Sequence, residues 1–253
     1  MILSQEKFIS INISIGSYST ILEELKELGA SRKSSYVCVA NVHMLIEAFT
    51  HPEFANIVNA GHIVTPDGMP LAKGIQFLYG YKQDRVAGMD LLPDLLQISK
   101  KAGLKVFFYG GTQNMLNKTQ AFCETEFPGL KLVGMISPPF REVSLIEENE
   151  YIEKINASHA NFVFVALGCP KQEKWMASMK GKINACMIGI GGALPVMIGM
   201  QKRAPSWMQK ASLEWLYRMV QEPKRLFKRY FYTNSLFLYL FLKELLITNF
   251  KKK

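Results

Sequence analysis

Short apolar runs recur along the first 199 residues of the chain. Most of them end in Gly, Pro, Asn or Asp and are followed by a stretch with helical spacing. Continuous apolar strands that alternate with helices are typical of a parallel sheet covered on both faces. The pattern therefore predicts an α/β fold: a Rossmann-like, mostly parallel sheet with helices on both faces. The predicted strands are residues 36–40, 62–64, 106–109, 132–135, 162–167 and 186–190.

The N-terminal segment has a different pattern. Residues 8–15 alternate apolar and polar side chains, which is the period of a half-exposed strand. Thr20 and Glu23 then have the spacing of a capping box in front of an apolar run. These residues predict one exposed strand and a helix that starts at about Thr20.

Near residue 200 the glycines thin out and a basic, aromatic segment begins. Pro205 suits the first turn of a helix that runs to about Gln221, and Pro223 ends that helix. A second helix is expected from about Lys224 towards the end of the chain. We therefore divide the chain into a Rossmann-like catalytic domain, residues 1–199, and a helical appendage, residues 200–253.

The net charge of +9 comes entirely from the appendage. Residues 1–199 hold 18 basic and 18 acidic side chains, whereas residues 200–253 hold 12 basic and 3 acidic ones. The appendage is also rich in Trp, Tyr, Phe and Leu, which favours an interfacial helix at an anionic bilayer over a solubilising tail. Its apolar stretch at 236–242 is far shorter than the roughly 20 residues of a spanning helix. The alternative is a helix packed on its own domain or on another subunit.

Several classes of site are absent from the sequence. The four cysteines are far apart, follow no zinc-ligand spacing and come without a secretory signal, which predicts free thiols in a reducing cytoplasm. There is no DxD, GxSxG, HExxH or GxGxxG segment. We therefore expect no metal and no cofactor.

Polar side chains that directly follow the predicted strands are candidates for chemistry, because ligands of parallel sheets bind at the carboxyl ends of the strands. Asp67 either caps a turn or accepts a proton from an acceptor hydroxyl as that oxygen attacks an anomeric carbon. Asn41 could orient the same acceptor. Arg85 either holds phosphate oxygens or pairs with a nearby carboxylate, Asp84 or Asp90.

Glycine-rich turns are candidates for holding a nucleotide. Gly110 and Gly111 follow one predicted strand, and Gly168 follows another. Backbone N–H groups at the start of a helix attract phosphate, and glycine allows close approach. Gly191 lies in a further glycine-rich segment, residues 189–192.

Taken together, these segments resemble the WecG/TagA/CpsF family of bacterial glycosyltransferases, which includes N-acetylmannosaminyltransferases. The resemblance spans roughly residues 40–230. It rests on the segments 65–68 (TPDG), 85–90 (RVAGMD), 107–111 (FFYGG), 167–173 (LGCPKQE), 202–208 (KRAPSWM), 213–218 (LEWLYR), 221–225 (QEPKR) and 228–230 (KRY).

The resemblance implies an inverting, metal-independent transfer from a UDP-sugar to a polyprenyl-diphosphate-linked saccharide in cell-wall or surface polysaccharide synthesis. The transferred sugar would be N-acetylmannosamine or a related hexose. Asp67 matches the family's proposed general base, with Asn41 beside it at the acceptor, and Arg85 and Gln172 match pocket residues.

The end of the chain matches an appendage that closes over the site at the membrane. Arg218 and Arg225 would supply positive charge to the diphosphate, which meets the need left by the missing DxD segment. Arg218, Arg225 and Arg229 are spaced by seven and four residues, so a continuous helix would align them. One position departs from the family, because Pro195 stands where many members carry a pocket carboxylate.

The expected partners are the UDP-sugar, the lipid-linked acceptor and an anionic membrane surface at the inner face of the plasma membrane. We expect no nucleic-acid partner, and the apolar appendage leaves a homo-oligomer open. Two other functions compete with this one. They are a dinucleotide-dependent oxidoreductase, which lacks its glycine fingerprint here, and a basic membrane or nucleic-acid adaptor without catalysis.

Overall fold

The computed structural model describes residues 3–251, apart from the side chains of Lys210 and residues 248–251. Six parallel strands form its main sheet in the order β4-β3-β8-β7-β5-β6. This confirms the predicted α/β, Rossmann-like fold, and every predicted strand of the sheet is present. The strands are β3 (Ser35–Ala40), β4 (Ile63–Pro66), β5 (Lys105–Gly110), β6 (Lys131–Ile136), β7 (Phe162–Ala166) and β8 (Cys186–Gly189).

Helices cover both faces of this sheet, and each strand supplies side chains to both layers. In β7, Val163 and Val165 join one buried cluster while Phe162 and Phe164 join the other, which explains its continuous apolar run. The first cluster packs against α2 (Val42–Thr50), α3 (Pro52–Asn59), α4 (Met69–Tyr79), α7 (Leu145–Ala157) and α8 (Lys171–Met179). The second packs against α1 (Tyr18–Ser31), α5 (Gly88–Ala102), α6 (Gln113–Glu126) and α9 (Ala193–Met197).

The N-terminal segment forms a hairpin, so the prediction of one strand over residues 8–15 was wrong. Strands β1 (Gln5–Phe8) and β2 (Ile11–Ser14) pair antiparallel, and the chain reverses at Ile9, which has a φ of 58°. The alternating pattern continues through the turn and therefore hides it. Helix α1 is also capped earlier than predicted, because the Ser17 side chain accepts a hydrogen bond from the Thr20 N–H group.

The appendage contains three helices: α10 (Ser206–Lys210), α11 (Glu214–Gln221) and α12 (Pro223–Lys251). The prediction of one helix from Pro205 to Gln221 was wrong, because the chain turns at Ser212, where φ is 63°. The long last helix is confirmed. In the part of the chain that the structure describes, no helix combines the length and apolar character needed to cross a membrane.

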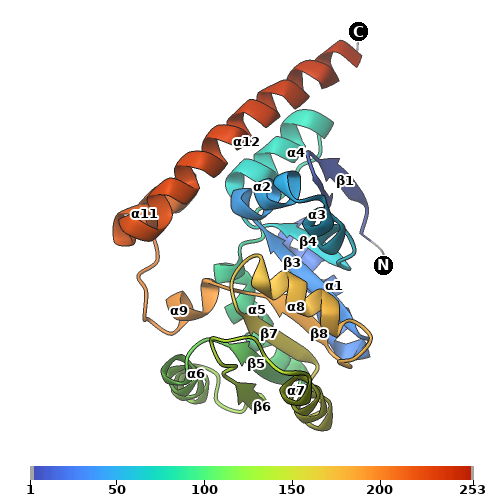
Figure 1. Cartoon of the computed structure of the whole chain (residues 1–253), viewed down its shortest axis with the longest axis vertical. Coiled ribbons are helices and arrows are strands. Elements are labelled where there is room, and N and C mark those ends of the chain that lie inside the picture. The colour runs from blue at the N-terminus through green and yellow to red at the C-terminus, as the bar shows by residue number, and fades with distance from the viewer. Residues whose placement is uncertain (1–2, 252–253) are drawn as a thin grey trace.

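Helix α12 lies across α2 and α4 at one end of the molecule (Figure 1). Phe237 and Phe241 stack with their ring centroids 5.8 Å apart, and both pack against the fully buried Phe8 of the hairpin. One side of α12 is thus packed on its own domain. Another side exposes large apolar residues, namely Phe227, Phe231, Tyr232, Leu238, Tyr239, Leu242, Leu246 and Ile247.

Candidate active site

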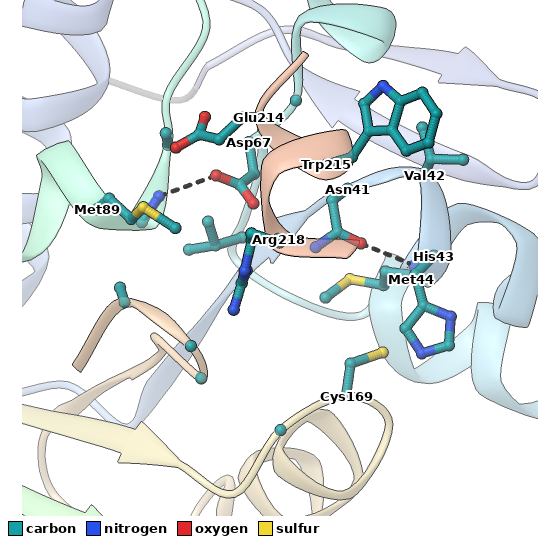
Figure 2. Close-up of a pocket in the computed structure, with 18 of the residues that line it drawn as sticks. Asn41, Val42, His43, Met44, Asp67, Met89, Cys169, Glu214, Trp215 and Arg218 are labelled. Carbon is teal, nitrogen blue, oxygen red and sulfur yellow. Dashed lines mark hydrogen bonds between the residues drawn. The ribbon is translucent and has the colours of Figure 1, made fainter. Parts of the chain in front are cut away.

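A cavity of about 1010 Å³ lies at the carboxyl ends of four strands, β3, β4, β7 and β8. Helix α11 and the first half of α12 contribute further lining residues, so the appendage forms part of the wall. The domain and the appendage therefore build this cavity together. Figure 2 shows Asp67, Asn41, Glu214, Trp215 and Arg218 around it.

Asp67 follows β4 and is fixed by two backbone contacts. Its N–H group donates to the Ala40 carbonyl at 2.8 Å, and its Oδ1 accepts from the Gly88 N–H group at 3.0 Å (Figure 2). The second contact joins the carboxylate to the first residue of α5. Asp67 thus bridges the end of β4 and the start of α5, and it also lines the cavity. The residues that the structure describes make no hydrogen bond to Oδ2.

The electrostatic surroundings of Asp67 make it a stronger base than an ordinary aspartate. Burial raises the pKa of its carboxyl group to about 6. The Gly88 N–H group opposes this shift, and the nearby Glu214 adds to it. Arg85 and Arg218 lower the pKa again. With a pKa of about 6, the group is mostly ionised at neutral pH and can accept a proton.

Asn41 directly follows β3 and caps α2. Its Oδ1 accepts from the Met44 N–H group at 3.2 Å, which fixes the orientation of the amide. The amide nitrogen then lies on the side towards Asp67 (Figure 2). This group can donate a hydrogen bond to an oxygen held between the two residues.

Arg85 forms two ion pairs. Its Nη2 lies 3.1 Å from Oδ2 of Asp90, and its Nη1 lies 2.7 Å from Oε2 of Glu214. Of the two alternatives for Arg85, the structure contains the pairing with Asp90. Asp84 accepts instead from the Tyr18 N–H group. Glu214 belongs to the appendage and was not predicted from the sequence.

Gly168, Gln172 and Gly191 meet beneath the cavity, and all three line it. The buried Gln172 accepts from the Gly168 N–H group at 3.2 Å and donates to Oε1 of Glu173 at 2.6 Å. A Cβ atom on Gly191, whose φ is 41°, would lie 3.3 Å from Oε1 of Gln172. Gln172 therefore supports two of the predicted glycine turns. Its partner Glu173, which lies in the segment 167–173 and was assigned no role from the sequence, is fully buried, and burial raises its pKa to about 7.

Gly110 and Gly111 are not among the residues that line the cavity. Gly110 has a φ of 109°, and a Cβ atom there would lie 2.7 Å from the carbonyl of Ala166 on β7. Gly111 has a φ of 78°, and a Cβ atom there would lie 2.8 Å from Sδ of Met115. Packing at the strand ends accounts for both glycines, whereas Met115 of the following helix reaches the cavity.

Arg218, Arg225 and Arg229 all line the cavity, although they belong to two separate helices. Arg218 lies against the turn at Gly192, where an added Cβ atom would be 2.5 Å from its Nη2. Arg225 pairs with Glu222. Arg229 has a buried Nε that makes no hydrogen bond to any residue that the structure describes. The appendage therefore contributes three arginines and one carboxylate, Glu214, to the cavity wall, which gives this wall a net positive charge.

Two further residues line the cavity. Pro195 is one of them, so the departure from the family pattern falls within the site. His43 is the other, and burial together with the nearby Arg229 lowers its pKa. Among residues 3–251, no three His, Cys, Asp or Glu side chains are grouped so that they could hold a metal ion.

Comparisons with known proteins show the family of the chain. A model of the glycosyl transferase WecG/TagA/CpsF family matches residues 6–251. The chain is similar to three proteins named N-acetylglucosaminyldiphosphoundecaprenol N-acetyl-beta-D-mannosaminyltransferase. That of Bacillus spizizenii is 30% identical over 194 residues, which cover 76% of this chain and 74% of that protein. Those of Bacillus subtilis and Staphylococcus aureus are 27% and 26% identical, covering 85% and 81% of this chain and 82% and 80% of theirs. The chain therefore belongs to the WecG/TagA/CpsF family and is a glycosyltransferase.

Proposed function

We propose that this glycosyltransferase moves N-acetylmannosamine or a related hexose from a UDP-sugar to a polyprenyl-diphosphate-linked saccharide during cell-wall or surface polysaccharide synthesis. The three relatives are named for transfer to N-acetylglucosaminyldiphosphoundecaprenol. The observation that carries the proposal is the presence of the basic carboxylate of Asp67 and three arginines in one cavity.

In the proposed reaction Asp67 is the general base. Oδ2 takes the proton from the acceptor hydroxyl while the hydroxyl oxygen forms a bond to C1 of the donor sugar. The bond between C1 and the β-phosphate oxygen breaks, and its electron pair leaves with UDP. A single displacement of this kind inverts the configuration at C1. The Asn41 amide nitrogen holds the acceptor oxygen beside the carboxylate.

The departing diphosphate needs positive charge, and the appendage supplies it in this proposal. Guanidinium groups form bidentate, charge-assisted hydrogen bonds with phosphate oxygens. These contacts stabilise the charge that develops as the bond breaks. Arg218, Arg225 and Arg229 take this role, so the transfer is proposed to proceed without a metal. The turns at Gly168 and Gly191, supported by Gln172, hold the nucleotide.

The exposed apolar side of α12 fits the interface of an anionic leaflet. Phe231, Leu242 and Leu246 are exposed there, and Lys224, Lys228 and Lys243 are exposed on the same helix. Apolar burial and attraction to anionic lipids act together in such helices. We place the enzyme at the inner face of the plasma membrane, where the appendage lies between the lipid-linked acceptor and the domain.

A transfer assay tests this function. The full-length protein is incubated with a panel of UDP-sugars and a synthetic polyprenyl-diphosphate N-acetylglucosamine, with and without EDTA, and the anomeric configuration of the product is determined. We expect one UDP-sugar to give a disaccharide of inverted configuration, at a rate that EDTA leaves unchanged. No transfer from any UDP-sugar, together with thermal stabilisation by NAD(P) and not by UDP, would overturn the proposal.

A further inference from the structure

Four charged side chains form a ring beside Asp67. Arg85 bridges Asp90 at 3.1 Å and Glu214 at 2.7 Å, and Arg203 lies 2.5 Å from the other oxygen of Asp90. The fourth side of the ring is looser, with 3.9 Å between Nε of Arg203 and Oε1 of Glu214. Both of these atoms are buried and make no hydrogen bond to the residues that the structure describes. The ring has no net charge.

The ring joins the two parts of the chain. Arg85 and Asp90 belong to the domain, whereas Arg203 and Glu214 belong to the appendage. The contact between Arg85 and Glu214 is the most enclosed one, since their side chains are only 15% and 18% exposed. Ion pairs shielded in this way are screened less by solvent than surface pairs. The ring therefore forms only when the appendage is seated on the domain.

The ring also determines what Arg85 does to Asp67. Both ends of the guanidinium group are occupied, Nη1 by Glu214 and Nη2 by Asp90, and no ion pair between Arg85 and Asp67 occurs among the residues described. A direct pair with Arg85 would engage the carboxylate and make it a weaker base. Glu214 also places a negative charge near Asp67, as Figure 2 shows.

We propose that Glu214 is a positioning residue that acts through Arg85. When the appendage is seated, Glu214 holds the guanidinium group away from a direct ion pair with Asp67, so the carboxylate remains available as the base. Without the Glu214 carboxylate, Arg85 loses this partner and turns to Asp67, which makes Asp67 a weaker base. This role rests on the proposed function of Asp67.

The test is the pH dependence of kcat, measured at saturating donor and acceptor, for the full-length Glu214→Gln variant. The charged groups that act on Asp67 are Arg85 from the segment before α5 and Glu214 and Arg218 from α11. Glu214 raises the pKa of Asp67 and Arg85 lowers it, so both the lost charge and the freed arginine lower it in the variant. We expect the acid limb of the profile to move about one unit to lower pH. The plateau should fall roughly tenfold, because the base is weaker.

Two further variants separate this role from a merely structural one. Glu214→Asp keeps the charge and should keep the acid limb within about 0.3 units of the wild-type position. Asp90→Asn frees the other end of Arg85 and should move the limb in the same direction as Glu214→Gln. The control is Glu148→Gln, which breaks the surface pair with Lys182, formed at 3.2 Å, and should leave the profile unchanged.

The outcomes are distinct. One outcome is that Glu214→Gln and Asp90→Asn lower kcat without shifting the acid limb of the pH profile, or that they weaken only UDP binding and thermal stability. In that case Glu214 merely holds the appendage, and the inference is overturned. If Asp67→Asn retains transfer, the proposed base itself is wrong. If Asp67→Asn is inactive while the acid limb of the Glu214→Gln profile lies at the wild-type pH, only the positioning role of Glu214 fails.

Discussion

At the scale of single residues, the chemistry of Asp67 depends on two opposing effects. Burial disfavours its charge, whereas the Gly88 N–H group and two nearby arginines favour it. The resulting pKa of about 6 lies close to neutral pH, where a general base combines ionisation with proton affinity. The contact with the Gly88 N–H group thus helps to keep the carboxylate ionised.

The charge at Arg218 can be tested separately from the base. Arg218→Met removes the guanidinium group but keeps much of the side-chain volume. Because the developing charge on the diphosphate then loses one donor, kcat should fall by about 10²-fold or more. Arg141→Met is the control, since Arg141 forms an exposed pair with Glu147. Unchanged kcat in Arg218→Met would show that the leaving group is neutralised elsewhere.

Sequence patterns predict residues at strand ends better than residues that meet across the chain. Asp67 and Asn41 directly follow neighbouring parallel strands, and the topology alone brings them together. Arg85 and Glu214 are 129 positions apart, so their pairing depends on how the appendage folds back. Gly110 illustrates an ambiguity of sequence patterns, because a glycine that packs closely against Ala166 has the same sequence pattern as a phosphate-binding turn.

At the scale of elements, the strongest predictions were the strands of the main sheet. Their side chains are buried on both faces, so the apolar runs are continuous and easy to recognise. The turns at Ile9 and Ser212 were missed. Both residues adopt positive φ without being glycine, and no Gly or Pro directly beside them marks a turn in the sequence.

The packing of α12 on the hairpin is a prediction at this scale. Phe241→Ala removes a ring that packs against Phe8 and Phe237, so the free energy of unfolding should fall by about 2 kcal/mol. Phe231→Ala is the matched control, since that ring is 71% exposed and its loss should change stability little. Chemical denaturation of both variants measures the difference. Equal stability would mean that the aromatic cluster does not hold the helix.

At the scale of the whole molecule, charge is divided between two parts of the chain. The domain is neutral and carries the base, whereas the appendage carries the whole excess of +9 and the cationic wall of the cavity. This division was visible in the sequence, because counting charges needs no structure. The ring that connects the two parts was not visible, because its members come from three separate segments, residues 85–90, 202–208 and 213–218.

The exposed side of α12 predicts salt-dependent binding to anionic vesicles. Replacing Phe231, Leu242 and Leu246 together by Ser removes apolar area that membrane insertion would bury, so flotation with phosphatidylglycerol vesicles should fall at least tenfold. Transfer to a short-chain, water-soluble acceptor should be retained, because none of the three residues lines the cavity. Unchanged flotation would mean that this side of the helix binds something other than lipid.

The most direct test of the account is transfer by Asp67→Asn, with UDP binding measured on the same preparation. Asparagine keeps an oxygen for the Gly88 N–H group but cannot take up the proton, so we predict a loss of kcat of at least about 10²-fold with the Kd for UDP unchanged. In the wild type, kcat should rise with pH through about 6, because the base acts only when ionised. Transfer at the wild-type rate by Asp67→Asn would contradict the central claim that this carboxylate is the base.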